Sequence, residues 1–123
     1  MDTAQINKML QKYFNAFYEA DAKELAKLFH EAAHIYGLDE NGVLRDIDRN
    51  TFIKIIDSVA PNSKNTDFIR KDEILSIDFI SKDAAVARIK LRFGDFAFTD
   101  ILSLISLDGE WKVISVLETS KPI

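Results

Sequence analysis

The chain has 123 residues, a formal net charge of −4 and no cysteine. Its length is typical of one domain, so we expect a single domain over residues 1–123. The absence of cysteine excludes disulfides and thiolate catalysis, and the absence of a basic block disfavours nucleic-acid binding. No segment has the pattern of a membrane span or a signal peptide, so we expect a cytoplasmic protein that does not bind membranes.

The first segment predicts a helix with a broad apolar stripe. Asp2 or Thr3 can cap its start, and apolar residues then recur at helical spacing. We expect the stripe to cover the inner face of a sheet. Tyr13 is then either a core residue with its hydroxyl near the edge or a hydrogen-bond donor into a pocket. The stripe consists of Ile6, Met9, Leu10, Tyr13, Phe14 and Phe17.

A short second helix and a small hairpin follow. Asp21-Ala22-Lys23-Glu24 has the pattern of a capping box, which predicts the start of the helix. Two short strands, over about 33–38 and 43–47, flank a polar turn. His34 and Tyr36 share one face of the first strand, so we expect both to line a pocket or neither to do so.

A third helix is predicted to run to about Val59. Phe52 and Ile56 lie on its apolar side, and Ala60-Pro61 is expected to end it. A polar loop over 61–67 then leads to a strand over about 69–80. The side chains of this strand that are expected to face inward are Leu75, Ile77 and Phe79.

The stretch 84–118 predicts three long strands joined by two tight turns, Gly94-Asp95 and Asp108-Gly109. As two-residue loops, these turns fix the register of both hairpins. Across the first turn the expected pairs are Phe93–Phe96, Leu91–Phe98 and Ile89–Asp100. Across the second turn they are Leu107–Glu110, Leu104–Val113 and Leu102–Ser115.

This register places an almost wholly apolar set of side chains on the inner face of the sheet, with Asp100 in its middle. A carboxylate among apolar side chains is costly unless it is paired, hydrogen-bonded or neutralised. Asp100 is therefore either a functional group or a structural one that bonds Tyr13, Ser115 or the backbone. The other members of the inner face are Ala87, Ile89, Leu91, Phe93, Phe96, Phe98, Leu102, Leu104, Trp111, Val113, Ser115 and Leu117.

The outer face of the same strands is mixed. It carries basic side chains and an apolar island, and exposed apolar patches of this kind commonly mark partner surfaces. We therefore expect a homodimer through the outer face. The island consists of Ile101, Ile105, Ile114 and Val116.

The order of elements predicts an α+β fold, with three N-terminal helices packed on a curved, mainly antiparallel sheet. The chain resembles the NTF2-like superfamily, and within it the SnoaL-like and putative lumazine-binding subgroup. The residues that carry the resemblance most clearly are 98–104 (FTDILSL) and 108–113 (DGEWKV). The resemblance implies a cone-shaped fold and, through the subgroup name, a lumazine ligand. It also relates the chain to ketosteroid isomerase, whose helix tyrosine corresponds to Tyr13, whose acid lies nearer Ser103, and whose base position is Gly37.

These observations favour a small-molecule-binding protein with an apolar and aromatic conical pocket and no cofactor. The alternatives are a SnoaL-like enzyme doing acid–base chemistry on a carbonyl compound, with Asp100 and His34 as catalytic residues, or a non-catalytic dimeric interaction domain. His30 and His34 are four residues apart but lack a third ligand, so no metal site is expected. The predicted ligand-binding residues are Tyr13, Phe17, His34, Tyr36, Phe52, Ile56, Phe79, Leu91, Phe98, Asp100 and Trp111.

Overall fold

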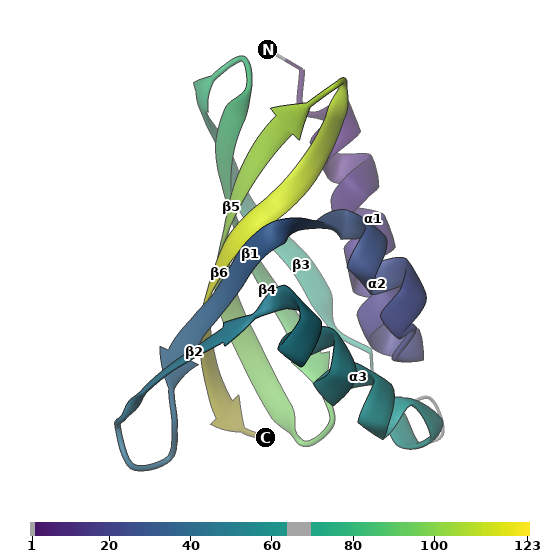
Figure 1. Ribbon diagram of the computed structural model, residues 1–123, viewed down its shortest axis with the longest axis vertical. Coiled ribbons are helices and arrows are strands. Elements are labelled where there is room, and N and C mark those ends of the chain that lie inside the picture. The colour runs from purple at the N-terminus through teal and green to yellow at the C-terminus, as the bar shows by residue number, and fades with distance from the viewer. Residues whose placement is uncertain (1, 64–69) are drawn as a thin grey trace.

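The computed structural model describes residues 2–63 and 70–123, with the backbone alone for 60–63. It confirms the predicted α+β architecture, since three helices lie on one side of a long, curled six-stranded sheet (Figure 1). The helices are α1 (Ala4–Glu19), α2 (Ala22–Leu28) and α3 (Arg49–Ser63). The strands are β1 (Phe29–Leu38), β2 (Leu44–Asp48), β3 (Asp72–Ser81), β4 (Ala84–Phe93), β5 (Phe96–Leu107) and β6 (Glu110–Pro122).

The strand order is β2-β1-β6-β5-β4-β3, and the pairing of β1 with β6 is the parallel one. Parallel neighbours need a long crossover connection, and here the rest of the sheet and α3 lie between β1 and β6 in the sequence. The face that the helices cover is called the inner face below. The opposite face is called the outer face.

The helix boundaries reflect local chemistry. The carboxylate of Asp2 accepts a hydrogen bond from the Ala4 N–H at 2.8 Å, and α1 ends where Ala20 adopts a left-handed conformation. Asp21 caps α2 by accepting from the Glu24 N–H at 3.2 Å, as the capping box predicts. The end predicted for the third helix was too early, because α3 continues to Ser63. Residues 64–67 of the predicted polar loop lie outside the described residues.

Both predicted turns occur, and the first hairpin has the predicted register. Gly94, Asp108 and Gly109 all have positive φ, as two-residue hairpin turns require. Strands β4 and β5 then pair without interruption, so that Ile89 lies opposite Asp100.

The second hairpin departs from the predicted register. Leu104 pairs with Val113 as expected, but a β-bulge comes next, and Leu102 pairs with Val116 instead of Ser115. Because side chains alternate along a strand, the extra residue reverses the faces of all later residues of β6. Val116 is therefore buried at 2% exposure and Leu117 is 51% exposed, which is opposite to the prediction.

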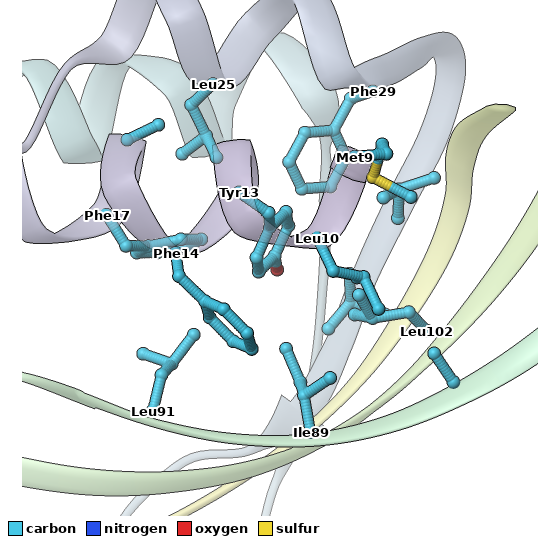
Figure 2. Packing of buried hydrophobic residues seen from close by; sticks show 14 of the residues in the cluster. Met9, Leu10, Tyr13, Phe14, Phe17, Leu25, Phe29, Ile89, Leu91 and Leu102 are labelled. Atoms are coloured by element: carbon cyan, nitrogen blue, oxygen red, sulfur yellow. The ribbon is translucent and has the colours of Figure 1, made fainter. Parts of the chain in front are cut away.

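A similar irregularity corrects the prediction for β3. Its pairing with β4 shifts between Ile74 and Ser76. Ile77 and Phe79 pack against the core as predicted, but Ile74 does so in place of Leu75. The core lies between α1 and the inner face, where Tyr13 and Phe14 point toward the sheet and Ile89 and Leu91 point back (Figure 2).

Candidate functional site

A polar row crosses the inner face of the sheet near its centre. Arg45 on β2 pairs with Gly37 on β1, and Glu118 on β6 pairs with Asp100 on β5, which pairs with Ile89 on β4. The parallel pairing of Tyr36 with Leu117 places Gly37 beside Glu118 and joins the two halves of the row. Two carboxyl groups and one guanidinium are thus aligned across neighbouring strands.

Asp100 is the most buried charged or polar side chain of the row. It is only 3% exposed, and its Oδ1 atom is inaccessible to solvent and has no hydrogen-bond partner among the residues that the structure describes. Burial and, to a smaller extent, the charge of Glu118 together raise the pKa of Asp100 from 3.8 to about 8, although a hydrogen bond from the Thr119 backbone opposes the rise. At neutral pH Asp100 therefore holds a proton that it can donate.

Glu118 differs from Asp100 because it has a cationic partner. Nη2 of Arg45 donates to Oε1 of Glu118 at 2.5 Å. Burial raises the pKa of Glu118, and the Arg45 guanidinium opposes that rise. Of the two carboxyl groups, Glu118 is thus the one that ionises more readily.

The glycine between Arg45 and Glu118 allows this ion pair. A Cβ atom on Gly37 would lie 3.1 Å from the Glu118 backbone oxygen and 3.7 Å from the Glu118 Cβ. Because Gly37 has no side chain, the Arg45 side chain can reach Glu118 across β1. The resemblance to ketosteroid isomerase implies a base at the position of Gly37. This chain has no side chain there, and the Arg45–Glu118 ion pair forms across the glycine instead.

Tyr13 faces the row from α1. Its side chain is 1% exposed and points from the helix toward the sheet (Figure 2). Burial raises the pKa of the Tyr13 hydroxyl well above its usual value, and the nearby charges of Asp100 and Glu118 raise it further. Tyr13 therefore remains a neutral O–H group that can donate a hydrogen bond.

Aromatic rings surround Tyr13 on the helical side. The ring centroid of Tyr13 lies 4.9 Å from that of Phe17 and 5.9 Å from that of Phe29. Phe17 in turn lies 6.0 Å from Phe52 and 5.7 Å from Phe93. We call these five rings the aromatic cluster. It brings together three residues of the predicted site, and the sequence prediction missed Phe29 and Phe93 as members.

Two further predicted residues lie close to the row, and a third lies in the core. Leu91 is buried and pairs with Phe98, which lies two residues before Asp100 on β5. Ile56 on α3 is buried in the same core. Leu91 and Phe98 are thus each two residues from the row along their strands.

His34 and Tyr36 lie on the outer face, away from Asp100. Ala33, Ile35 and Gly37 are buried at alternating positions of β1, so His34 and Tyr36 between them project to the other side. The two rings stack with centroids 6.0 Å apart, and Nδ1 of His34 lies 2.7 Å from Oδ1 of Asp46. The structure therefore does not bring His34 together with Asp100 as the predicted catalytic pair.

Phe79 and Trp111 belong to the core but lie at the other end of the sheet. Their ring centroids are 6.0 Å apart, and Phe79 pairs with Ala85. Ala85 is four residues from Ile89 along β4, which corresponds to about 13 Å. The predicted pocket residues that lie on the inner face are thus divided between its two ends.

An open groove of about 970 Å³ lies elsewhere. It is lined by residues 70–73, by residues of β4, β5 and β6, and by Ile123, and by none from a helix. Leu91 and Phe98 of the predicted site are among them. The basic side chains of Lys90, Arg92 and Lys121 point to the outer face. Asp100 does not line it. The groove is thus separate from the polar row and the aromatic cluster.

Two absences hold for the residues that the structure describes. Over 2–63 and 70–123, no three side chains of His, Asp or Glu are grouped so that they could hold a metal ion. In the same ranges, no helix has the length and apolarity needed to cross a membrane.

Sequence reasoning missed Glu118 and Arg45. Asp100 and Glu118 are both charged residues in strands. An unbroken register would place only Asp100 on the apolar face, so Glu118 was not recognised as its neighbour. Arg45 shares a face with Gly37, and a glycine flanked by apolar strand residues is a signal of close approach by another group. That signal is present in the sequence, but it does not identify the approaching residues.

Solved structures resemble the chain over nearly its whole length. An NTF2-like protein of unknown function from Shewanella baltica is 29% identical, with 98% of this chain and 94% of that chain covered and a TM-score of 0.85. One from Silicibacter pomeroyi is 22% identical, with 98% and 100% covered and a TM-score of 0.84. A ketosteroid isomerase-like protein from Erwinia carotovora shares the fold, at 17% identity, 98% and 96% coverage and a TM-score of 0.74.

No curated protein is significantly similar to the chain. Residues 1–117 match the model of a family described as putative lumazine-binding. The match spans almost the whole chain, and the solved structures agree with it in fold. The chain therefore belongs to the putative lumazine-binding family and has an NTF2-like fold.

Proposed function

We propose that this protein binds a small, planar heteroaromatic molecule of the lumazine class between α1 and the inner face of the sheet. The observation that carries the proposal is the buried Oδ1 atom of Asp100, for which the described part of the chain supplies no hydrogen-bond partner. An unsatisfied buried polar atom costs about 1–3 kcal/mol. A ligand atom that bonds Asp100 would recover this free energy.

The surroundings of Asp100 suit such a ligand. The aromatic cluster offers faces and edges for a planar ring, and Tyr13 adds a second hydroxyl donor from the opposite side. Binding sites of this kind combine apolar and aromatic walls with a few polar groups. The family description supports the choice of a lumazine.

The test is a titration of the protein with lumazine, in which binding is monitored by calorimetry and by the chemical shifts of the backbone amides. We expect saturable binding with shifts around Tyr13 on α1 and Asp100 on β5. Asp100→Leu should weaken binding at least tenfold, which corresponds to about 1.4 kcal/mol. Asp95→Leu, at an exposed turn, is the matched control and should bind as the parent does.

Two outcomes would reject this function. One is the absence of saturable binding. The other is a set of shifts confined to the outer groove near Lys90 and Lys121, which would place the ligand on the opposite face.

The outer face supports a second proposal, that two copies of the chain associate through it as single-domain protomers. Ile101 and Leu117 are cross-strand partners that are 38% and 51% exposed, and Ile105 lies on the same face. This outer apolar patch (Ile101, Ile105 and Leu117) replaces the predicted island, because Val116 is buried and Ile114 is half-buried at the bulge. An exposed apolar patch favours association.

Light scattering after gel filtration tests the association. We expect a dimer for the parent chain and a monomer for Ile101→Glu. Val43→Glu, which changes an exposed apolar residue of the small hairpin, should remain dimeric. A parent chain that is monomeric at high concentration would contradict the proposal.

A further inference from the structure

Asp100 and Glu118 form a matched pair of hydrogen-bonding groups. They are direct cross-strand partners on one face of an antiparallel ladder. Side chains in such pairs have Cβ atoms about 5 Å apart, so both carboxyl groups can converge on one edge of a bound molecule. Asp100 has a free Oδ1 atom, whereas Oε1 of Glu118 is held by Arg45.

The different partners give the two groups opposite roles. Glu118 lies beside a guanidinium, which favours its ionised form, so it acts as an acceptor. Asp100 has no cationic partner among the described side chains that face it, and its raised pKa keeps its proton, so it acts as a donor. The row thus offers one donor next to one acceptor.

We propose that the Asp100–Glu118 pair recognises the cis-amide edge of a ligand, in which a ring C=O lies beside a ring N–H. The Asp100 hydroxyl donates to the C=O, and the Glu118 carboxylate accepts from the N–H. Lactams and imides, such as pteridine and pyrimidine diones, have this edge. The inference rests on the proposed function and adds to it the chemical group that determines specificity.

The pair disfavours other planar molecules of similar size. A quinone or ketone has an acceptor for Asp100 but no donor for Glu118, so the Glu118 oxygen that Arg45 does not bond would face the ligand without a hydrogen bond from it. An aromatic carboxylate would place a second negative charge beside Glu118. A site built to bond an N–H group discriminates strongly against an analogue that lacks it.

The experiment compares lumazine with 1,3-dimethyllumazine by calorimetry. Dimethylation keeps the ring system and both carbonyls but removes both N–H donors. We expect the dimethyl compound to bind at least roughly 100-fold more weakly to the parent protein. The two monomethyl compounds then show which N–H lies at Glu118.

Variants separate hydrogen bonding from steric exclusion of the methyl groups. In Glu118→Leu the acceptor is absent, so the preference for lumazine should fall to within a few-fold. Glu118→Gln keeps an amide oxygen as a weaker acceptor and should give an intermediate preference. Glu118→Gln also replaces Glu118→Leu in the test if the leucine variant does not fold, as judged by the lack of a cooperative unfolding transition.

The outcomes distinguish this inference from the proposed function. Equal binding of lumazine and 1,3-dimethyllumazine to the parent protein would overturn the inference and leave the proposed function intact. A preference that is unchanged in both Glu118 variants would do the same. The absence of binding by either compound would reject the function and the inference together.

Discussion

The two hairpins of the central sheet have equally clear turns but differ in how their strands pair beyond those turns. In β4–β5 the pairs run without interruption from Phe93–Phe96 to Ala84–Ile105. In β5–β6 the pairing shifts between Ser103 and Leu104. A turn therefore determines which side chains meet only as far as the next bulge.

The bulge also determines the chemistry of the candidate site. In an uninterrupted register from the second turn, Leu117 would lie opposite Asp100 on the inner face, and Glu118 would face outward. The additional residue places Glu118 opposite Asp100 instead. Bulges next to functional sites commonly redirect side chains in this way. The contrast between the hairpins is thus the structural origin of the carboxyl pair.

Glutamate substitutions at two neighbouring positions test the bulge directly and should give the largest effect. Val116→Glu would bury an unpaired carboxylate in the core, and we expect a loss of about 4 kcal/mol or more in the free energy of unfolding. Leu117→Glu lies on the outer face and should change the stability of the single folded chain, measured at a concentration where it is monomeric, by less than about 1 kcal/mol. Urea denaturation of both variants provides the measurement.

The control for this pair lies in the uninterrupted hairpin. Ile89→Glu on the inner face should be as damaging as Val116→Glu, and Lys90→Glu on the outer face should be tolerated. If Leu117→Glu were the damaging change and Val116→Glu the tolerated one, β6 would have the unbroken register.

The pH dependence of stability tests the state of Asp100. Its pKa is about 8 in the folded protein and 3.8 for an ordinary aspartate, so between these values the folded state binds more protons than the unfolded state. Stability therefore falls as pH rises from 4 to 8, by at most about 1.4 kcal/mol per pH unit for one proton. Asp100→Asn should reduce this slope.

Urea denaturation at several values between pH 5 and 8 gives the slopes. Tyr13 and Glu118 also face Asp100, and the raised pKa of Glu118 leaves part of the slope in the variant. Asp95→Asn at an exposed turn should leave the slope as it is. A parent protein whose stability rises over this range relative to Asp100→Asn would show that Asp100 is ionised.

Gly37→Ala tests the close approach that permits the Arg45–Glu118 ion pair. The new Cβ would be 3.1 Å from the Glu118 backbone oxygen, so β1 and β6 must separate by a few tenths of an ångström. We expect a loss of about 1–2 kcal/mol in stability and weaker lumazine binding. Gly42→Ala is the control. It should lower stability only because Gly42 has a positive φ, and it should leave lumazine binding unchanged. Equal lumazine affinities in the two variants would show that Gly37 does not contribute to the lumazine site.

The sequence was sufficient to predict the parts of the fold that depend on local patterns. The apolar stripe of α1, the capping box at Asp21 and the register of β4–β5 all result from spacing and turn chemistry. Asp100 was recognisable as a carboxyl group on an apolar face. These features need only the residues close to each position in the sequence or across a two-residue turn.

The remaining features depend on interactions that local patterns do not determine. The bulge in β6 carries no glycine or proline, so Glu118 could not be assigned to the inner face. The alternation in β1 shows that His34 and Tyr36 share a face, but burial of Ala33 and Ile35 decides which face it is. Arg45 reaches Glu118 across β1, and only the parallel β1–β6 pairing brings these two segments together.

Replacing Arg45 should have the smallest effect on stability and a specific effect on ionisation. Arg45→Met keeps the length of the side chain but removes the cation, and because the Arg45 side chain is 45% exposed, we expect a loss of less than about 1 kcal/mol. Without the guanidinium, the pKa of Glu118 should rise toward that of Asp100. The two groups would then share one proton, and the separation into donor and acceptor would weaken.

Carbon-13 NMR titration of the glutamate side-chain carboxyls measures this change. The midpoint assigned to Glu118 should shift upward in Arg45→Met and remain in place in Arg88→Met, which removes an exposed cation from the outer face. Lumazine affinity should fall only in Arg45→Met. An unshifted Glu118 midpoint would mean that the guanidinium does not set the charge of the pair, and the asymmetry between Asp100 and Glu118 would then have to arise from their different burial.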